Sequence, residues 1–137
     1  MALKDKILQV MGGMHPAAIA TLDQGMPAVR FMVLNGFPDL TLVGATGKSS
    51  RKVAQLRKNP NASVSIWSGK EFTDPYVVIR AKAEVHEDLP TKKKYWTPLM
   101  EQYFKTVDNP EYVVLVFVPL EIELTDPKTM AMETWKR

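Results

Sequence analysis

Seven consecutive residues, Thr46 to Lys52, combine three hydroxyl and three cationic side chains in one short segment. The apolar run 40–46 is typical of a β-strand, and the spacing that follows predicts a helix over residues 50–59. Ser49 or Ser50 is a favourable N-cap for that helix. The segment is therefore a polar loop that joins a strand to the start of a helix, which is a common place to bind an anion.

The position of the charges in this loop supports the same chemistry. Lys48, Arg51 and Lys52 crowd the helix end where free backbone N–H groups already create positive potential. An exposed cation at that end costs up to about 1 kcal/mol. A bound anion would reverse this cost, so the loop predicts a phosphate site, with a solvated basic turn as the alternative reading. The spacing GxxxxGK[ST] is absent, so this is not a Walker loop.

A further cation, Arg30, interrupts the apolar strand expected over residues 28–34. Strand alternation places Arg30 on the same face as Met32 and Leu34, where a buried guanidinium needs a partner. The alternative is an edge position from which the side chain reaches water. If this strand lies beside the strand 40–46 in an antiparallel meander, Arg30 and the loop converge on one anion.

The remaining pattern predicts a mainly β protein with a few helices. Helices are expected at residues 4–14, at 50–59, and at 88–104 with a break at Pro98, and a hairpin loop at 23–27. Strands are expected at residues 17–22, 28–34, 40–46, 62–67, 76–86 and 112–118, the last continuing in alternation over 120–124. This pattern indicates a six-stranded antiparallel barrel, closed or split. The run 112–118 is apolar on both faces, and we expect a homodimer to supply its second cover.

Composition narrows the classes of function. The 137 residues fit a single domain, residues 1–137, and the net charge of +3 permits an acidic ligand without requiring nucleic acid. With no cysteine and two histidines far apart in sequence, neither a thiolate nucleophile nor a metal centre is expected. The sequence shows no membrane span and no signal peptide, so we expect a cytoplasmic protein with no membrane partner.

In order and spacing, these residues resemble the pyridoxamine 5′-phosphate oxidase-like split β-barrel proteins, which bind FMN. The motif Thr46-x-x-x-Ser50-Arg51-Lys52, followed by Leu56 and Asn59-Pro60, is similar to the flavin-phosphate segment of that family. The earlier Thr21-x-x-x-Gly25-x-Pro27-x-x-Arg30-x-Met32 is similar to its strand–turn–strand opening. Residues 88–96 and Asn109-Pro110-Glu111-Tyr112 resemble the general stress protein branch.

The resemblance implies a homodimer that holds FMN at the subunit interface. It assigns the phosphate to Arg30, Ser50, Arg51 and Lys52, and the phosphate or ribityl chain to Thr46. Backbone at Phe31, Met32, Val33 and Ala45 would follow the isoalloxazine and ribityl groups. It also implies an aromatic residue from the second subunit near the ring, for which Trp96 and Trp135 are the candidates.

The implied function is an FMN-binding oxidoreductase that exchanges electrons with small-molecule donors and acceptors, with no catalytic side chain assigned. The likeness does not extend to the Arg-x-His element of true pyridoxamine-phosphate oxidases, because residues 131–137 contain no histidine. We therefore do not expect that activity. The alternatives are a non-catalytic flavin carrier or redox sensor, a deazaflavin or haem in place of FMN, and a small basic barrel that binds single-stranded nucleic acid.

Overall fold

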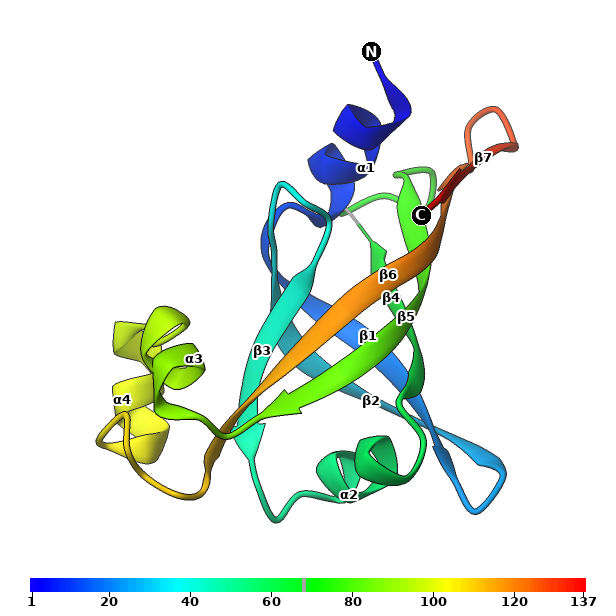
Figure 1. The fold of residues 1–137 in the computed structure, drawn as a ribbon. Helices are drawn as coiled ribbons and strands as arrows, with labels where there is room; N and C mark the ends of the chain where they lie inside the picture. Colours follow the sequence, from blue (N-terminus) through cyan, green and yellow to red (C-terminus); the bar gives the residue numbers. More distant parts are fainter. Residues whose placement is uncertain (68) are drawn as a thin grey trace.

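Six antiparallel strands close into a barrel, and a seventh extends one edge of the sheet (Figure 1). The computed structural model describes residues 1–67 and 69–137. Its strands are β1 (Gly13–Asp23), β2 (Met26–Gly36), β3 (Leu42–Gly47), β4 (Asn61–Trp67), β5 (Tyr76–His86), β6 (Tyr112–Asp126) and β7 (Ala131–Lys136). The sheet order is β3-β2-β1-β4-β5-β6-β7, and pairing of β3 with β6 closes the barrel. The predicted six-stranded antiparallel barrel is confirmed.

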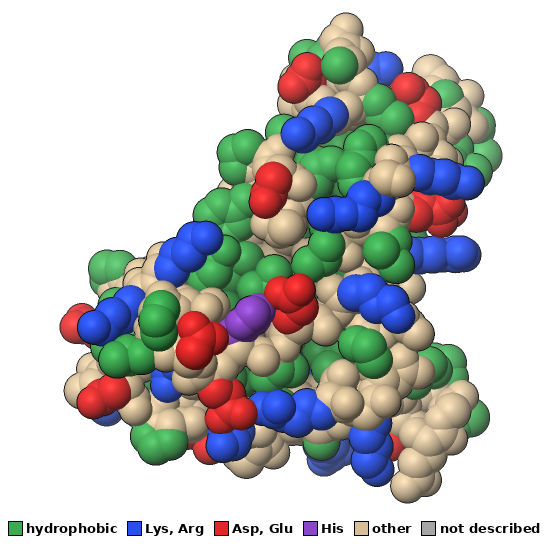
Figure 2. All heavy atoms as spheres, in the orientation of Figure 1, with side chains coloured by type: hydrophobic (Ala, Val, Ile, Leu, Met, Phe, Trp, Pro, Cys, Tyr) green, Lys and Arg blue, Asp and Glu red, His purple; other side chains and the backbone are tan. Residues whose placement is uncertain are grey.

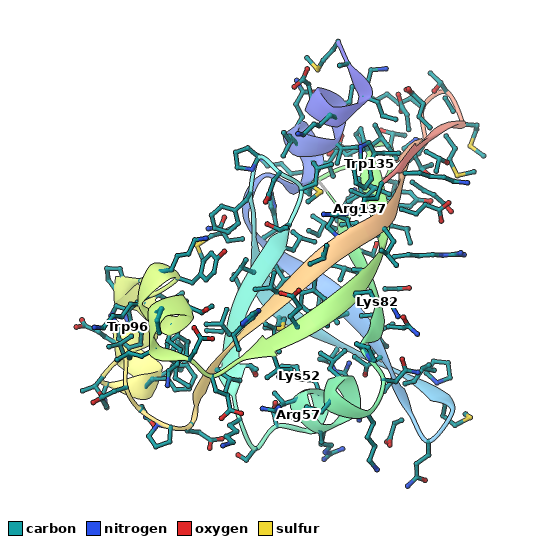
Figure 3. All side chains as sticks on the ribbon, in the orientation of Figure 1. Lys52, Arg57, Lys82, Trp96, Trp135 and Arg137 are labelled. Atoms are coloured by element: carbon teal, nitrogen blue, oxygen red, sulfur yellow. The ribbon has the colours of Figure 1, made fainter. Side chains whose placement is uncertain are left out.

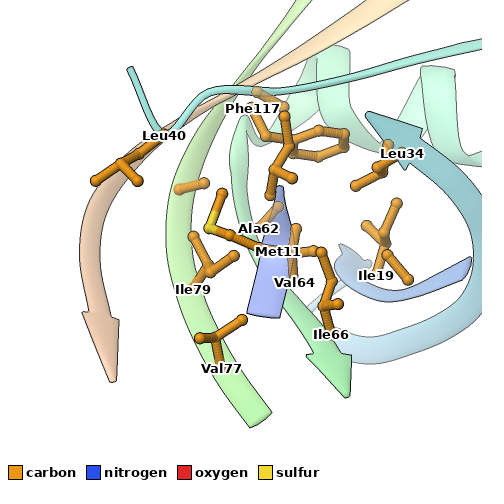
Figure 4. Close-up of a cluster of buried hydrophobic side chains, with 14 of the residues drawn as sticks. Met11, Ile19, Leu34, Leu40, Ala62, Val64, Ile66, Val77, Ile79 and Phe117 are labelled. Carbon is orange, nitrogen blue, oxygen red and sulfur yellow. The ribbon is translucent and has the colours of Figure 1, made fainter. Parts of the chain in front are cut away.

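Two helices close opposite ends of the barrel (Figure 1). Helix α1 (Leu3–Met11) buries Ile7, Val10 and Met11 at one end, where Met11 lies among core side chains from several strands (Figure 4). Helix α2 (Arg51–Lys58) buries Val53 and Leu56 at the other end. The core is thus a single apolar cluster inside the barrel, sealed by one face of each helix.

The first helix is shorter than predicted, and the first hairpin is tighter. The helix ends at Met11, because Gly12 is extended and Gly13 has a φ of 80°, so β1 begins where helix was expected. The hairpin turns on Gln24 and Gly25 alone, with φ values of 52° and 81°. Two consecutive positive φ angles give a two-residue turn whose twist suits a hairpin, so the strands run further than the loop expected at 23–27.

The last two strands also depart from the expectation. Strand β6 is one 15-residue strand that continues through Pro119, because Leu120 forms a bulge between the pairs Ala81↔Pro119 and Arg80↔Glu121. Strand β7 was not predicted, and it pairs antiparallel with residues 121–126 of β6. The bulge interrupts the alternation along β6, and β7 forms by a local hairpin pairing with the end of β6.

The second apolar face of β6 is covered by the chain's own helices. Helices α3 (Leu89–Lys94) and α4 (Pro98–Phe104), separated near Pro98 as predicted, lie beside β3 and β6 (Figure 1). The rings of Trp96 and Phe104 lie 5.3 and 5.1 Å from that of Tyr112. The expectation that a homodimer covers this face is wrong, because the aromatic residues of the helical segment pack onto their own strand.

The same cover is tied down by polar contacts. The Tyr112 hydroxyl donates to the Lys92 carbonyl at 3.0 Å, and the buried Lys92 ammonium donates to the Asn109 carbonyl at 2.9 Å. Burial raises the pKa of Tyr112 to about 12, so its hydroxyl stays a donor.

Among the described helices, none is long and apolar enough to cross a membrane.

Candidate functional site

Arg30 lies at the barrel end that α2 closes, on the more buried face of β2, as strand alternation predicted. Its Nη1 donates to Thr21 Oγ1 at 2.7 Å and to the Ile19 carbonyl at 3.2 Å, and its Nη2 donates to Gln55 Oε1 at 2.8 Å. Thr21 in turn donates to Gln55 at 2.6 Å, so α2 and two strands hold the guanidinium together. All of these acceptors are neutral, and they orient the positive charge of Arg30 without cancelling it.

Lys52, in the first turn of α2, is a cation whose pKa is affected by this guanidinium. Burial lowers the pKa of Lys52, and repulsion by Arg30 lowers it further. Burial alone also lowers the pKa of Arg30. Among the described residues, neither side chain forms an ion pair with a carboxylate. Arg30 is hydrogen-bonded to Gln55, one turn after Lys52 on α2, so two partly buried positive charges share this helix without an acidic partner, which favours an anion there.

The helix, rather than strand pairing, brings these two cations together. Strands β2 and β3 pair only at Asn35↔Val43 and Gly36↔Leu42, so pairing with β3 does not carry Arg30 to the loop, as the meander argument supposed. Lys52 reaches Arg30 because α2 packs under β1 and closes the barrel. Figure 3 shows Lys52 and Arg57 at this end of the molecule, and Figure 2 shows basic side chains along the same end.

The other charges of the loop point elsewhere. Lys48 forms an ion pair with Glu87 at 2.8 Å, and Glu87 is also paired with Arg57. The Ser49 amide donates to Glu111 at 2.8 Å, and the Ser49 hydroxyl also donates to Glu111. These hydrogen bonds, the hydroxyl's first, lower the pKa of the Glu111 carboxyl. Arg51 is exposed and lines a groove with the turn between β1 and β2. The loop does not direct three cations at one point, and Lys52 is the one beside Arg30.

The hydroxyl of Ser50 is left over in this arrangement. Ser50 occupies the N-cap position of α2 as predicted, but its side chain makes no capping hydrogen bond. Its Oγ is buried without a partner among the described residues. A buried hydroxyl without a partner is uncommon in native proteins, and an anion at the start of α2 would supply an acceptor. Ser50 therefore fits the phosphate role that the family resemblance implies.

The strand backbones assigned to the flavin border an opening in the barrel wall. Strand β3 pairs with β6 along its whole length, whereas β2 leaves β3 before Asn35. Residues Phe31, Met32 and Val33 therefore follow one side of this split and Ala45 lies on the other. The strands stay close at Gly44, where an added Cβ would lie 2.8 Å from Cε of Met32. In the described part of the chain, β2 has no ladder partner in β3 before Asn35, so a flat ligand could hydrogen-bond to backbone groups along that edge.

A cavity of about 540 Å³ opens beside this split. Val33, Ala45 and Thr46 form part of its wall, together with Asn35 from β2. The opposite wall comes from the segment that contains α3 and α4, with Tyr95, Thr97, Leu99, Met100, Tyr103 and Phe104. Three residues assigned from sequence thus share one cavity, and the lining contains no charged side chain.

The two tryptophan candidates lie apart from this cavity in their own chain. Trp96 packs against Tyr112 and does not line the cavity, and Trp135 packs against the barrel core from β7. Figure 3 shows the two at separate parts of the molecule. The aromatic residues of the α3–α4 segment that line the cavity are Tyr95, Tyr103 and Phe104.

Several of the residues that shape the site were not identified from sequence. Gln55 holds Arg30, yet a glutamine within a helix carries no distinguishing local signal. Asn35 and Thr97 line the cavity from segments far apart in sequence, and only the fold brings them together. Among the described residues, no group of three or more His, Asp or Glu side chains is placed to hold a metal ion.

Comparison with known proteins gives one consistent family. The family model for pyridoxamine 5′-phosphate oxidase matches residues 3–126. The chain is 31% identical over 124 residues to general stress protein 26 of Bacillus subtilis (strain 168), covering 89% of this chain and 87% of that protein. The crystal structure of general stress protein 26 from Bacillus anthracis str. Sterne superposes with a TM-score of 0.83 at 24% identity, covering 100% of both chains.

More distant structures share the fold but differ in what their names say they bind. A pyridoxamine 5′-phosphate oxidase-related, FMN binding protein from Nostoc punctiforme has a TM-score of 0.68 at 12% identity, covering 98% of this chain and 90% of that one. A heme binding protein from Mycobacterium smegmatis has a TM-score of 0.78 at 16% identity, covering 99% of this chain and 59% of that one. At these identities, the likeness shows the fold alone.

Proposed function

The chain belongs to the pyridoxamine 5′-phosphate oxidase family, and on that premise we propose that it is an FMN-binding flavoprotein that transfers electrons. The proposed phosphate site lies at the barrel end beneath α2. The isoalloxazine ring would follow the split between β2 and β3 toward the cavity. FMN would supply the redox chemistry, since its ring accepts and returns a hydride, and the protein would bind and orient it.

One observation carries this proposal: Arg30 is hydrogen-bonded to Gln55 of α2, Lys52 lies one turn earlier on the same helix, and neither cation has a carboxylate partner among the described residues. A phosphate dianion would relieve the repulsion between them and accept charge-assisted hydrogen bonds. The buried Ser50 hydroxyl would gain its missing acceptor at the same place. Arg51 would contribute through its backbone amide at the helix start and through a side chain that can turn toward the ligand.

The remaining assigned residues would hold the rest of the cofactor. Backbone at Phe31, Met32, Val33 and Ala45 borders the split, and Thr46 lies between the loop and the cavity. These groups can hydrogen-bond a planar ring and exclude water from one of its faces. No acid or base is assigned, because the cavity lining contains no titratable side chain other than the tyrosines.

We also propose that the protein is a homodimer with this site at its interface. Val29 and Phe31 on β2 are 71% and 77% exposed, and Val33 and Met14 extend the same apolar surface. A contiguous apolar face of this kind on a barrel wall is typical of a protein interface. A second copy would bury these side chains and cover the flavin edge that the split leaves open.

Turnover of pyridoxamine phosphate is not part of the proposal. The C-terminal residues form β7 beside β6, and residues 131–137 carry no histidine. These residues therefore do not supply the Arg-x-His element of true pyridoxamine-phosphate oxidases.

The test is a visible absorption spectrum of the purified protein, followed by titration of stripped protein with FMN. We expect flavin absorbance after purification, or saturable FMN binding after stripping. A colourless protein that does not bind FMN would overturn the proposal. Parallel titrations with haem and with a deazaflavin identify the cofactor if FMN fails.

A second candidate function is a flavin carrier or redox sensor without turnover. The absence of Lys, Arg, Asp, Glu and His from the cavity lining favours it, because only tyrosine hydroxyls are left there to move a proton. It predicts the same spectrum, but bound FMN that is reduced by NADPH or NADH no faster than free FMN. Stopped-flow reduction under anaerobic conditions distinguishes the two functions.

A further inference from the structure

We propose that the α3–α4 side of the cavity is a separate binding site for an uncharged, flat, aromatic carbonyl compound. The inference deepens the proposed function, since it leaves the Val33, Ala45 and Thr46 side to the flavin ring. The cavity volume of about 540 Å³ falls within the range of small-molecule sites, roughly 300–1,000 Å³. Figure 1 shows α3 and α4 projecting beside β3, so this wall is built from one continuous segment.

The lining excludes a charged ligand. No Lys, Arg, Asp or Glu side chain lines the cavity, and the basic groups of the proposed phosphate site lie on α2 at the barrel end. A sulfonate, carboxylate or phosphate placed here would lose hydration without gaining a counterion from the lining, since Lys94, whose Nζ lies 5.2 Å from the centroid of the Tyr95 ring, is not one of the lining residues. A neutral ligand would not incur that cost, and its apolar surface would be removed from water.

The same lining favours a flat aromatic shape. Tyr95 and Phe104 present ring surfaces that are held in place, whereas Tyr103 is 72% exposed. The Tyr95 ring lies edge-on to Phe37 with centroids 5.7 Å apart, and the Phe104 ring lies 5.1 Å from that of Tyr112. Fixed rings of this kind stack on a planar ligand with little loss of side-chain freedom. Met100 is unbranched and polarisable, and can adapt to the edge of such a ligand.

Carbonyl oxygens are the groups that the polar residues of the wall can bind. The hydroxyl of Thr97 is buried without a hydrogen-bond partner among the described residues. Rotation about its χ1 exchanges the positions of hydroxyl and methyl, so the residue can donate into the cavity. Asn35 lines the opposite wall and brings a side-chain amide that can donate to a second oxygen. A planar ring with two carbonyl groups, as in a naphthoquinone, would satisfy both.

The test is isothermal titration of the FMN-loaded protein, and of the stripped protein, with menadione as the probe. The chain has no cysteine, so thiol addition to the quinone does not complicate the binding curve. The matched charged probe is 1,4-naphthoquinone-2-sulfonate. We expect saturable menadione binding to both forms, with the sulfonate bound at least tenfold more weakly.

Two variants locate the site. Thr97→Val keeps the shape and removes the hydroxyl, and should weaken menadione binding about three- to tenfold. Met100→Trp fills the α3–α4 side of the cavity and should abolish menadione binding, whereas Leu89→Trp, an exposed position on α3 outside the lining, should leave it unchanged. All three should retain the FMN affinity of the parent protein.

The inference is overturned if Thr97→Val and Met100→Trp bind menadione as the parent does, or if the sulfonate binds equally well. It is also overturned if menadione does not bind, as would follow if a second copy of the chain filled the cavity. Displacement of FMN by menadione would overturn it too, because the flavin ring would then occupy the same part of the cavity. Menadione binding to protein that never binds FMN would sink the proposed function and leave this site standing.

Discussion

Arg30 has two roles, one in the packing of α2 and one in the charge of the proposed anion site. It fixes α2 to the barrel through Gln55 and Thr21, and it places a positive charge beside Lys52. Because both acceptors are neutral, the structure orients this charge and leaves it available. The anion site thus depends on one side chain that also determines where the helix lies.

Replacing Lys52 by alanine should weaken FMN binding about 10- to 100-fold, equivalent to about 1.5–3 kcal/mol for a charge-assisted hydrogen bond. Lys58→Ala is the matched control, because Lys58 is exposed in the last turn of the same helix and carries the same charge. Fluorescence titration measures both affinities, and circular dichroism checks the fold. Equal loss in the two variants would mean that only net charge matters.

FMN affinity should pass through a maximum with pH. The phosphate loses its second proton near pH 6, so affinity should rise between about pH 5 and 7. Burial and then Arg30 lower the pKa of Lys52 below its ordinary 10.5, so the ammonium is lost, and affinity falls, at a pH below that value. Without ligand the sign is opposite: charged Lys52 destabilises the fold, and stability is regained as pH rises through this window. Titrations across pH should show no such alkaline fall in Lys52→Ala.

The polar link between β1, β2 and α2 should contribute measurably to stability. Thr21→Val removes the hydroxyl that joins Arg30 to Gln55, and should lower the free energy of unfolding by about 1–3 kcal/mol. Thr73→Val, on an exposed turn, is the control. Urea denaturation followed by circular dichroism measures both variants. An unchanged midpoint for Thr21→Val would mean that water replaces the hydroxyl at no cost.

Strands and helices with strong local signals were predicted well. β5 was predicted at 76–86 from strict alternation, and the helical segment was predicted to break at Pro98. β7 was missed because residues 131–136 form a strand only against β6. The cover of β6 was wrongly assigned to a second subunit, because sequence shows that a face is apolar but not which segment packs on it.

The candidate site follows the same division. The loop at residues 46–52 and the strand arginine were recognisable from residue type and spacing, and the structure brings Arg30 and Lys52 close together. The ion pair of Lys48 with Glu87 was not recognisable, since the two residues are distant in sequence. The cavity beneath α3 and α4 was not foreseeable either, because no single segment of the sequence encodes it.

The exposed β2 surface should mediate dimer formation. Phe31→Asp places a charge in the centre of that surface and should shift a dimer toward monomer in sedimentation equilibrium. Phe72→Asp is the control, since Phe72 is 98% exposed on a turn. A parent protein that is monomeric at tens of micromolar, or a Phe31→Asp variant that stays dimeric, would contradict the proposed interface.

The proposed flavin function depends on a phosphate bound where α2 begins. The direct measurement is a comparison of FMN with riboflavin, which has the same ring and ribityl chain but no phosphate, by titration of one preparation of stripped protein. The account predicts that FMN binds at least 100-fold more tightly, and that Lys52→Ala removes most of this difference. Equal affinity for the two flavins, or no affinity for either, would contradict it.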